Sequence, residues 1–405
     1  MEVTLVGVGL GNPTTLTAAA AAALQQADGL IGSRRLLEEC PLPQSVPRKF
    51  STKSAEIVEI LKGQDWQNPC VLYSGDTGFY SGARMLVPLL EAEHIPFQVL
   101  PGISSLQYFA AHLGRSWQEW SIVSAHGLSC DPVGEVLSAH GKPVFFLTSG
   151  SEGAGSLCER LTQAGMGHLT ATVGQSLSYP QEEIFSDSVS RLAGRAFSPL
   201  TVLLVEGYTS CRPACSQGLP DEAFLRGDVP MTKQEVRAAA IGKLEVRDGE
   251  TYWDVGAGTG SVSVELALLA PHSKVCAVEC KGEACSLIRA NREKFGVYNL
   301  ELTQGRAPEI LSQLPAPDAV FLGGSGGELP AILEEALHKN PAARFCITAI
   351  AVETLGTAVA AMTQLGMEPQ ISQVTVARSR EAGELHLMMG QNPVWIITGR
   401  KEALV

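Results

Sequence analysis

The chain has 405 residues, 45 % of them hydrophobic, and its 30 basic and 42 acidic side chains give a formal net charge of −12. This length predicts at least two domains, and the composition is that of a globular protein. No apolar run approaches the ~20 residues that a membrane helix needs, and the N-terminus lacks the pattern of a signal peptide. We therefore expect a cytoplasmic protein that makes no contact with a membrane.

Acidic side chains are in excess in both halves of the chain. Residues 1–210 carry a net charge of −7 and residues 211–405 a net charge of −5. Domains that bind nucleic acid usually have a basic surface, so no nucleic-acid partner is expected. The ten cysteines show no spacing typical of a metal site or a disulfide framework. We expect free thiols and no bound metal.

Strand-like and helix-like segments alternate through the first half, which predicts an α/β fold with largely parallel sheets. The predicted strands are Val3–Val8, Cys70–Tyr73, Gln98–Leu100, Ser121–Val123, Val144–Thr148, Leu169–Val173 and Thr201–Val205. The predicted helices are Thr15–Gln26, Ser33–Glu39, Ala55–Leu61, Ala83–Ala92, Ser104–Leu113, Pro132–His140 and Glu152–Ala164. These strands are too many for one small sheet, so we expect two subdomains that divide near residues 110–125.

A segment rich in Gly, Pro and Ser interrupts this alternation at residues 207–218. It has no hydrophobic periodicity, and its composition is typical of a linker. We therefore expect one domain over residues 1–206, a second over residues 219–405, and a boundary near residue 212.

The second half restarts the alternation. The predicted strands are Thr251–Val255, Lys274–Glu279, Leu300–Gln304, Ala319–Leu322, Phe345–Ala349, Ile371–Arg378 and Val394–Thr398, with helices at Ser261–Ala270 and Glu283–Phe295. No helical stretch separates the last two strands, which therefore predict an antiparallel pair. The second domain should contain a sheet of about seven strands.

A glycine-rich loop follows the first strand of the second half, with the sequence Asp-Val-Gly-Ala-Gly-Thr-Gly over residues 254–260. Glycines let a ligand approach the backbone closely, and the following helix offers free N–H groups. Glu279 closes the next strand, where an acidic residue can accept hydrogen bonds from ribose hydroxyls. Dinucleotide enzymes use the same arrangement, but the tight glycine spacing and the terminal strand pair favour a methyltransferase that uses S-adenosylmethionine.

This loop and the segments at residues 229–237, 305–308 and 317–327 resemble, in order and spacing, the decarboxylating precorrin methyltransferases of cobalamin biosynthesis, which act on carbon 15. The resemblance covers about residues 219–400 and implies a Rossmann-like, seven-stranded class I methyltransferase fold. The residues that it places at the cofactor are Thr232, Gly256, Ala257, Gly258, Thr259 and Gly260, with Glu279 on the ribose and the backbone of Ala307 on the adenine. The residues expected on the substrate side are Gly323, Gly324, Ser325 and Gly326.

Two of these assignments have an alternative, and one neighbouring position departs from the family pattern. Thr232 begins a capping-box pattern that ends in a carboxylate, so it is also a candidate helix N-cap. The glycines at 323–327 are also compatible with a plain turn between a strand and a helix. Arg306 stands where related methyltransferases commonly have an acidic residue, so the resemblance carries no side-chain contact to the adenine there.

The first half has its own glycine loop, with Gly7, Gly9 and Gly11 before Pro13. Asp28 follows at a distance that suggests a dinucleotide site, but it precedes a strand-like segment instead of ending one, and a lone glycine loop is weak evidence. Segments 73–82, 100–105, 124–127, 145–149 and 173–180 instead resemble the tetrapyrrole methylase family, most closely the branch that methylates carbon 5 of a precorrin. This resemblance covers about residues 1–206 and implies two α/β subdomains with S-adenosylmethionine in the cleft.

The cofactor contacts expected in this half are Gly9, Gly75, Asp76, Phe79, Ser104, Ser105, Leu147 and Thr148, and His126 is expected at the substrate. Local structure offers other interpretations. Asp76 can form a turn with its own backbone, Ser104 and Ser105 can cap a helix, and His126 can be structural. Leu128 replaces an arginine that this branch usually has after its His-Gly pair.

Together the two resemblances imply a fused, bifunctional methyltransferase that acts on carbons 5 and 15 of precorrin-6B, removes the ring C acetate carboxyl group and gives precorrin-8. They imply one S-adenosylmethionine per domain, a tetrapyrrole substrate and a homo-oligomer. No catalytic residue is predicted, because methyl transfer mainly requires positioning. The cations considered for the acetate carboxylate are Lys233, Arg378, Arg380 and His386, each of which could equally be a surface charge.

Two other functions stay open from the residues. An RNA methyltransferase shares either fold, but the acidic charge of both halves argues against it. A tetrapyrrole carrier without enzymatic activity would need neither cofactor loop.

Overall fold

The computed structural model describes residues 1–401 except 41, 44, 127–129, 149–152, 210–216 and 325. The chain divides into two compact units. The first unit contains Met1–Cys130, Lys142–Thr162 and Gly167–Glu206, and the second contains Asp131–Gly141, Gln163–Met166 and the chain from Gly207 onward. Among the described helices, none combines the length and the apolar character needed to cross a membrane.

The first sheet of the first unit is entirely parallel, with the strand order β3-β2-β4-β1-β5. Its strands are β1 (Val3–Gly7), β2 (Gly29–Gly32), β3 (Arg48–Phe50), β4 (Pro69–Tyr73) and β5 (Phe97–Leu100). Its helices are α1 (Ala18–Gln25), α2 (Arg34–Glu39), α3 (Ser54–Lys62) and α4 (Ala83–Ala92), with a short 3-10 turn at Pro13–Thr15. Leu5 packs toward α3 and α4, whereas Val6 packs toward α1 and α2, because successive side chains of a strand point to opposite faces.

The second sheet of this unit has the order β6-β7-β10-β8-β9. Its strands are β6 (Ser121–Ser124), β7 (Val144–Leu147), β8 (Thr170–Gln175), β9 (Glu183–Ser188) and β10 (Thr201–Glu206), and its helices are α5 (Ser105–His112), α7 (Ala154–Gln163) and α8 (Val189–Leu192). Two sheets in this unit confirm the expected two subdomains. The expected parallel arrangement is wrong for this sheet, because only β6 and β7 run parallel and β9 follows β8 without a crossover helix.

The second unit is built on a seven-stranded sheet with the order β13-β12-β11-β14-β15-β19-β16, which confirms the predicted strand number. Its strands are β11 (Thr251–Val255), β12 (Lys274–Glu279), β13 (Leu300–Gln304), β14 (Ala319–Leu322), β15 (Arg344–Ala349), β16 (Gln370–Val374) and β19 (Val394–Gly399). Its helices are α6 (Pro132–Ser138), α9 (Gln234–Leu244), α10 (Ser261–Leu269), α11 (Gly282–Phe295), α12 (Leu329–Lys339) and α13 (Val352–Gln364), with 3-10 turns at Asp221–Ala223 and Leu311–Gln313.

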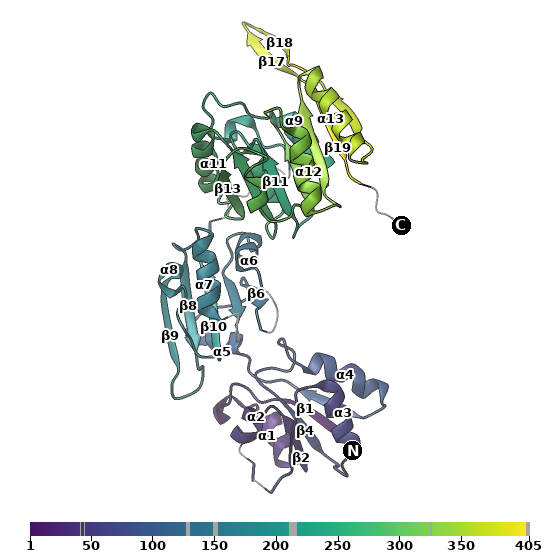
Figure 1. Cartoon of the computed structure of the whole chain (residues 1–405). Helices are drawn as coiled ribbons and strands as arrows, with labels where there is room; N and C mark the ends of the chain where they lie inside the picture. Colours follow the sequence, from purple (N-terminus) through teal and green to yellow (C-terminus); the bar gives the residue numbers. More distant parts are fainter. Residues whose placement is uncertain are drawn as a thin grey trace. The chain divides into compact units, whose positions relative to one another are not determined.

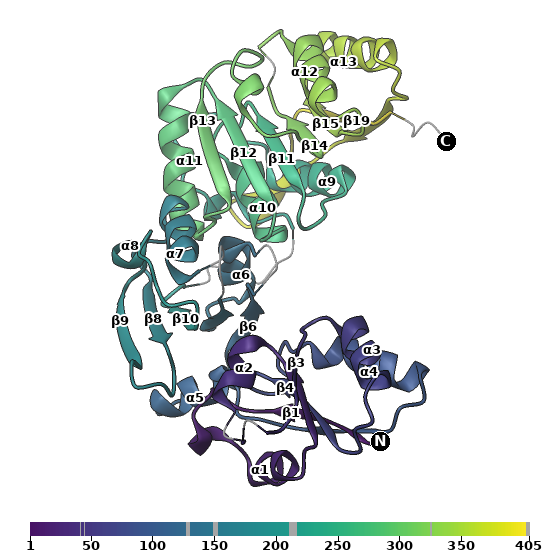
Figure 2. The same ribbon diagram turned by 60° about the horizontal axis from the view of Figure 1, so that its bottom comes forward.

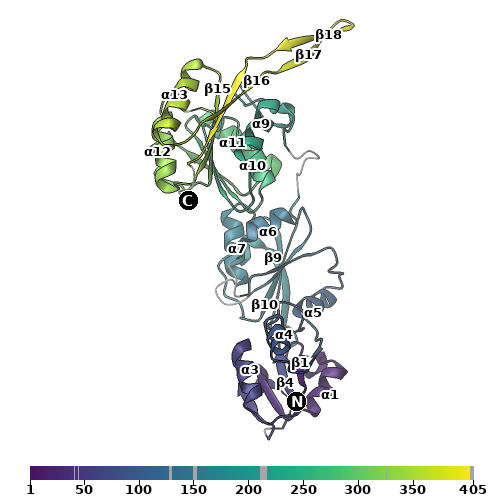
Figure 3. The ribbon, with the colours of Figure 1, turned by 90° about the vertical axis from the view of Figure 1, so that its right-hand side faces the viewer.

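Helices cover both faces of this sheet (Figures 2 and 3). Tyr252 and Trp253 are adjacent in β11 and are both fully buried. Tyr252 packs in the core formed with α9, α10 and α11, whereas Trp253 packs in the core formed with α12 and α13. Because both faces are covered, the carboxyl ends of the strands are the natural place for a ligand.

A two-stranded ribbon extends from this unit (Figure 1). It consists of β17 (Ala377–Ala382) and β18 (Leu385–Gly390) and is inserted between β16 and β19, which pair antiparallel as predicted. The single strand predicted at Ile371–Arg378 is wrong, because β16 ends at Val374 and Arg378 belongs to β17. The ribbon residues are largely exposed, so no burial pattern marks these strands in the sequence.

Candidate active sites

Three glycines bring the ends of β1, β4 and β5 together in the first unit. A Cβ atom on Gly102 would lie 2.1 Å from the carbonyl oxygen of Gly75 and 2.6 Å from that of Gly7. Gly9 and Gly75, both with positive φ, exchange two backbone hydrogen bonds of 3.2 and 2.7 Å. We call Gly7, Gly75 and Gly102 the glycine junction; only residues without side chains permit it.

The carboxylate of Asp76 holds this junction in place. Its Oδ1 accepts a 2.9 Å hydrogen bond from the backbone N–H of Gly78, which confirms the turn interpretation. Its Oδ2 accepts a 3.0 Å bond from the N–H of Gly102 and thereby ties the loop after β4 to the loop after β5. Asp76 therefore has a structural role as well as a place on the cavity wall described below.

Ser104 caps helix α5. Its Oγ accepts from the N–H of Gln107, and the Gln107 side chain accepts from the N–H of Ser104, which completes a capping box. The capping interpretation is thus confirmed for Ser104. It is wrong for Ser105, which is the first residue inside the helix.

A cavity of about 260 Å³, which we call the first cavity, lies beside the glycine junction. Eight of the nine residues predicted for the first half line it, namely Gly75, Asp76, Phe79, Ser104, Ser105, His126, Leu147 and Thr148. Gly9 is absent from its wall and instead pairs with Gly75. The Thr148 hydroxyl donates a 2.7 Å hydrogen bond to the carbonyl of Thr201. Leu128 lies outside the described residues.

Sequence reasoning missed several residues of this wall. Arg35, Tyr73, Ser74, Tyr179 and Thr201 also line the first cavity. Burial raises the pKa of Tyr73 to about 12, and its buried hydroxyl has no hydrogen-bond partner among the described residues. Of this group, Tyr73, Ser74 and Tyr179 fall inside segments that carry the family resemblance, whereas no motif marks Arg35.

The second unit contains a larger cavity of about 650 Å³, the second cavity, at the carboxyl ends of its parallel strands. The predicted residues that line it are Thr232, Gly256, Ala257, Gly258, Glu279, Gly323, Gly324 and Gly326. The structure therefore brings most of the cofactor loop and of the predicted substrate-side loop to one space. Ser325 lies outside the described residues.

The glycine loop of this cavity touches two other segments through its backbone. A Cβ atom on Gly256, which has a φ of +74°, would lie 2.4 Å from the carbonyl oxygen of Gly324. One on Gly258 would lie 2.8 Å from the carbonyl oxygen of Pro230. Side chains at these positions would push apart the three segments that form the wall.

Glu279 binds backbone N–H groups with both carboxylate oxygens. Its Oε2 accepts a 2.9 Å hydrogen bond from Gly258, and its Oε1 accepts bonds of 2.8 and 2.9 Å from Cys280 and Lys281. The carboxylate thus fixes the glycine loop relative to the end of β12. It also remains on the cavity wall, where it can accept further hydrogen bonds from a ligand.

Asp254 is fully buried beneath the same loop. The hydroxyl of Ser263 donates a hydrogen bond to Oδ2, while Oδ1 has no partner among the described residues. Burial raises the pKa of this carboxyl group to about 6, although the Ser263 bond opposes the shift. An unpartnered carboxylate oxygen at a cavity wall can accept a hydrogen bond from a cationic or hydroxyl-bearing ligand.

Three predicted cofactor residues are absent from the cavity wall. Thr259 is buried, its hydroxyl has no partner among the described residues, and its carbonyl accepts from Asn291. Gly260 is the N-cap of helix α10 and has a φ of +77°. Ala307 is partly buried and packs against the core that includes residues of α12 and α13.

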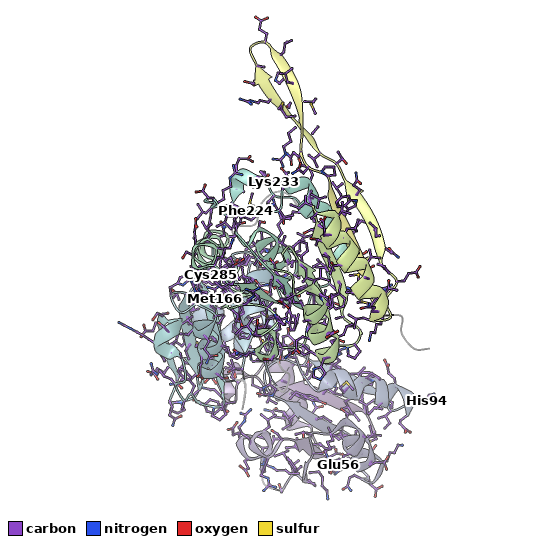
Figure 4. All side chains as sticks on the ribbon, turned by 45° about the horizontal axis from the view of Figure 1, so that its top comes forward. Glu56, His94, Met166, Phe224, Lys233 and Cys285 are labelled. Atoms are coloured by element: carbon purple, nitrogen blue, oxygen red, sulfur yellow. The ribbon has the colours of Figure 1, made fainter. Side chains whose placement is uncertain are left out.

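A buried cation supports the segment that carries Thr232. The N-cap interpretation of Thr232 is wrong, because α9 is capped by Lys233 and no side chain bonds there. Instead, the Thr232 carbonyl accepts a 2.5 Å bond from Arg237, whose guanidinium also lies 2.6 Å from Glu265 and 4.7 Å from the centre of the Phe224 ring. Arg237 is fully buried. Figure 4 shows Phe224 and Lys233 in the second unit.

Of the four cations considered for a substrate carboxylate, only Lys233 lines a described cavity wall. Arg378 binds both oxygens of Glu235, at 3.0 and 2.6 Å, and Asp221 at 2.9 Å. The hydrogen bond to Glu235 is the main reason that the pKa of Arg378 is raised. Arg380 and His386 lie on the exposed ribbon. A second lysine that the sequence reasoning missed, Lys281, lines the second cavity.

No group of three His, Cys, Asp or Glu side chains within the described part of the chain is placed to hold a metal ion.

Comparisons with known proteins match both halves. Residues 2–193 match the tetrapyrrole (corrin/porphyrin) methylases, and residues 222–401 match the precorrin methyltransferase domain. A probable decarboxylating cobalt-precorrin-6B C(15)-methyltransferase from Pyrobaculum calidifontis is 44 % identical over 46 % of this chain and 97 % of its own. A decarboxylating precorrin-6Y C(5,15)-methyltransferase from a Sinorhizobium species is 29 % identical over 92 % of this chain and 93 % of its own.

Among solved structures, the crystal structure of a precorrin-6Y C5,15-methyltransferase from Geobacter metallireducens is 36 % identical in sequence. It covers 46 % of this chain and 97 % of that chain, with a TM-score of 0.44.

Proposed function

The chain belongs to the family of decarboxylating precorrin C5,15-methyltransferases of cobalamin biosynthesis, and from this premise we propose what each unit does. Residues 1–206 methylate carbon 5 of precorrin-6B, residues 219–405 methylate carbon 15 and remove the ring C acetate carboxyl group as CO₂, and residues 207–218 join them. The product is precorrin-8. The observation that carries this proposal is the presence of two separate cavities, each in its own unit and each lined by the loop that the matching family predicts.

S-adenosylmethionine is the methyl donor implied by both families, and we propose one molecule per unit. It supplies a methyl group on a sulfonium centre, which an electron-rich carbon of the tetrapyrrole can attack. In the second cavity, Glu279 suits the ribose hydroxyls, and the unpartnered oxygen of Asp254 can accept a hydrogen bond from the cofactor. In the first cavity, the Tyr73 hydroxyl and the loop that ends at Ser104, the N-cap of α5, offer polar groups that can form hydrogen bonds with a nucleoside.

The chemistry asks the protein mainly for orientation and exclusion of water. The glycine junction of the first unit and the glycine loop of the second let backbone approach the ligands closely. For decarboxylation, Lys233 and Lys281 on the wall of the second cavity can hold the acetate carboxylate before it leaves as CO₂. The bonding electrons left behind pass into the conjugated ring system, and a proton then added to the side-chain carbon leaves a methyl group in place of the acetate.

Incubation of the full chain with precorrin-6B and S-adenosylmethionine, followed by mass spectrometry, tests this function. The expected product has gained two methyl groups and lost CO₂. Calorimetry with S-adenosylhomocysteine should give two sites per chain, and a single site would contradict one cofactor per unit. A product with no methyl gain would contradict the enzyme and favour a tetrapyrrole carrier.

We further propose a cytoplasmic homo-oligomer that does not bind nucleic acid. The net charge of −12 supports the last point, since phosphate backbones bind basic surfaces. Tight RNA binding at physiological salt would contradict it and favour an RNA methyltransferase, and light scattering tests the oligomer.

A further inference from the structure

One cation of the first unit has no part in the function proposed above. Arg35 lies in α2 and lines the first cavity, where it is the only Lys or Arg on the described wall. Its Nη1 donates to the Tyr179 hydroxyl at 2.6 Å and to Glu39 Oε2 at 3.0 Å, and its Nη2 donates to the Ser74 hydroxyl at 3.1 Å. The Tyr179 hydroxyl in turn donates to Glu39 at 2.9 Å. We call these four residues the Arg35 cluster.

The glycine loop after β1 makes room for this cluster. Gly11 has a φ of +98°, and a Cβ atom there would lie 2.2 Å from the Tyr179 hydroxyl oxygen and 3.0 Å from Glu39 Oε2. Gly11, the last glycine of the motif that superficially resembles a dinucleotide loop, therefore leaves the space that the Arg35 cluster occupies. The cluster joins α2, the end of β4 and the loop after β8 at one edge of the cavity.

The ion pair within the cluster is suited to exchange. Arg35 and Glu39 have side chains that are 34 % and 32 % exposed, and they are four residues apart in one helix. Pairs of this kind contribute little to stability, so an incoming carboxylate can replace Glu39 at small cost. A guanidinium can bind a carboxylate through two parallel hydrogen bonds, which fixes orientation as well as position.

We propose that Arg35 binds a peripheral carboxylate of the tetrapyrrole, which replaces Glu39 as its partner. This contact orients the ring for methylation in the first unit. This inference rests on the proposed function, because it assigns a contact within the same reaction. The first half carries a net charge of −7, so a polycarboxylate needs a local cation to enter this cavity. His126 is the one histidine on the described wall.

The test uses the full chain and a set of single substitutions. Arg35→Gln removes the guanidinium, Arg35→Lys keeps the charge without the paired hydrogen bonds, and Glu39→Gln removes the competing carboxylate. Arg34→Gln is the matched control, because Arg34 is adjacent in α2, lies over the Phe50 ring at 5.4 Å and is absent from the cavity wall. An isotope-labelled methyl donor and NMR distinguish methylation at carbon 5 from methylation at carbon 15.

For carbon 5, Arg35→Gln should raise KM for the tetrapyrrole about 10- to 100-fold, the range expected for a lost charge-assisted hydrogen bond. Arg35→Lys should recover part of this loss. Arg34→Gln should match the wild type, and Glu39→Gln should leave KM equal or lower. The affinity for S-adenosylhomocysteine and the carbon 15 reaction should not change.

A purely structural cluster would behave differently. Glu39→Gln and Arg35→Gln would then raise KM alike, or kcat and the affinity for S-adenosylhomocysteine would fall together with the melting temperature. Either result, or equal KM values for Arg35→Gln and Arg34→Gln, would overturn the inference. If the wild-type chain adds no methyl group at carbon 5, the proposed function of the first unit fails instead.

Discussion

The two cavities are held open by different forces. The first cavity rests on the glycine junction, where backbone groups from three strand ends meet without intervening side chains, and the one carboxylate on its described wall, Asp76, is only partly buried. The second cavity rests on buried charge, because the buried carboxylates of Asp254 and Glu279 line its wall and the buried Arg237–Glu265 pair supports the segment that carries Thr232. Comparable cofactor chemistry can thus be supported by close packing in one unit and by electrostatics in the other. The two units should therefore fail under different substitutions and at different pH.

Glu279→Gln should separate the two activities most strongly. The loss of a carboxylate that binds the glycine loop, and that we propose to bind the ribose, should slow carbon 15 methylation and CO₂ release on the order of 10²- to 10⁴-fold. Carbon 5 methylation should persist. Product analysis by mass spectrometry measures both, with Glu301→Gln on the neighbouring strand β13 as an exposed control. Equal loss at both carbons would mean that the two sites depend on each other.

Glu265→Gln should destabilise only the second unit. Arg237 and Glu265 are 0 % and 2 % exposed, so the variant leaves a buried guanidinium without the nearer of its two carboxylate partners. We expect the free energy of unfolding of this unit to fall by about 3–5 kcal/mol. Calorimetric unfolding measures it, and Glu235→Gln, whose side chain is 40 % exposed, should cost about 1 kcal/mol or less. A similar decrease in the free energy of unfolding in both variants would show that burial of the ion pair does not determine the size of the effect.

Gly102→Ala should be the corresponding change in the first unit. Its Cβ atom would lie 2.1 Å from a carbonyl oxygen, so the glycine junction must open. Overpacking of this kind costs about 1–3 kcal/mol, and carbon 5 methylation should fall while carbon 15 methylation stays. The control is Gly63→Ala, where the nearest atom would be 3.4 Å away. A wild-type melting temperature for Gly102→Ala would refute the role of the junction.

The pH dependence of stability should show the smallest difference. The pKa of Asp254 is raised from 3.8 to about 6 in the folded state, so the folded chain binds more protons than the unfolded chain between these values. Its contribution to stability therefore decreases as pH rises through this window, by about 1 kcal/mol between pH 5 and pH 7. Asp254→Asn should remove this dependence, which denaturant unfolding at the two pH values can measure. An unchanged difference between the two pH values would exclude Asp254 as its source.

The alternation of apolar segments and the glycine loops predicted the sheets and most of the cavity walls, because strands of parallel sheets end at a common edge. Other features depend on contacts between distant residues. Arg35 lies outside the sequence motifs, and only the fold places it beside Tyr179. Strand β9 and the β17–β18 ribbon lack a buried face, so their sequences show no periodic pattern. The capping pattern wrongly predicted Thr232 as a helix N-cap, because in the fold the Thr232 carbonyl accepts a hydrogen bond from the side chain of the buried Arg237.

In both units the last strand in sequence occupies an interior position of its sheet. β10 lies between β7 and β8, and β19 lies between β15 and β16. Because synthesis runs from the N-terminus to the C-terminus, β10 and β19 each leave the ribosome after the two strands that they pair with. At ~5–20 residues per second, synthesis from β10 to β19 takes about 10–40 s. During that interval both sheets of the first unit can already be complete. In the second unit, β15 still has an unpaired edge until β19 is synthesised. The nascent second unit is therefore the part that would need protection by chaperones.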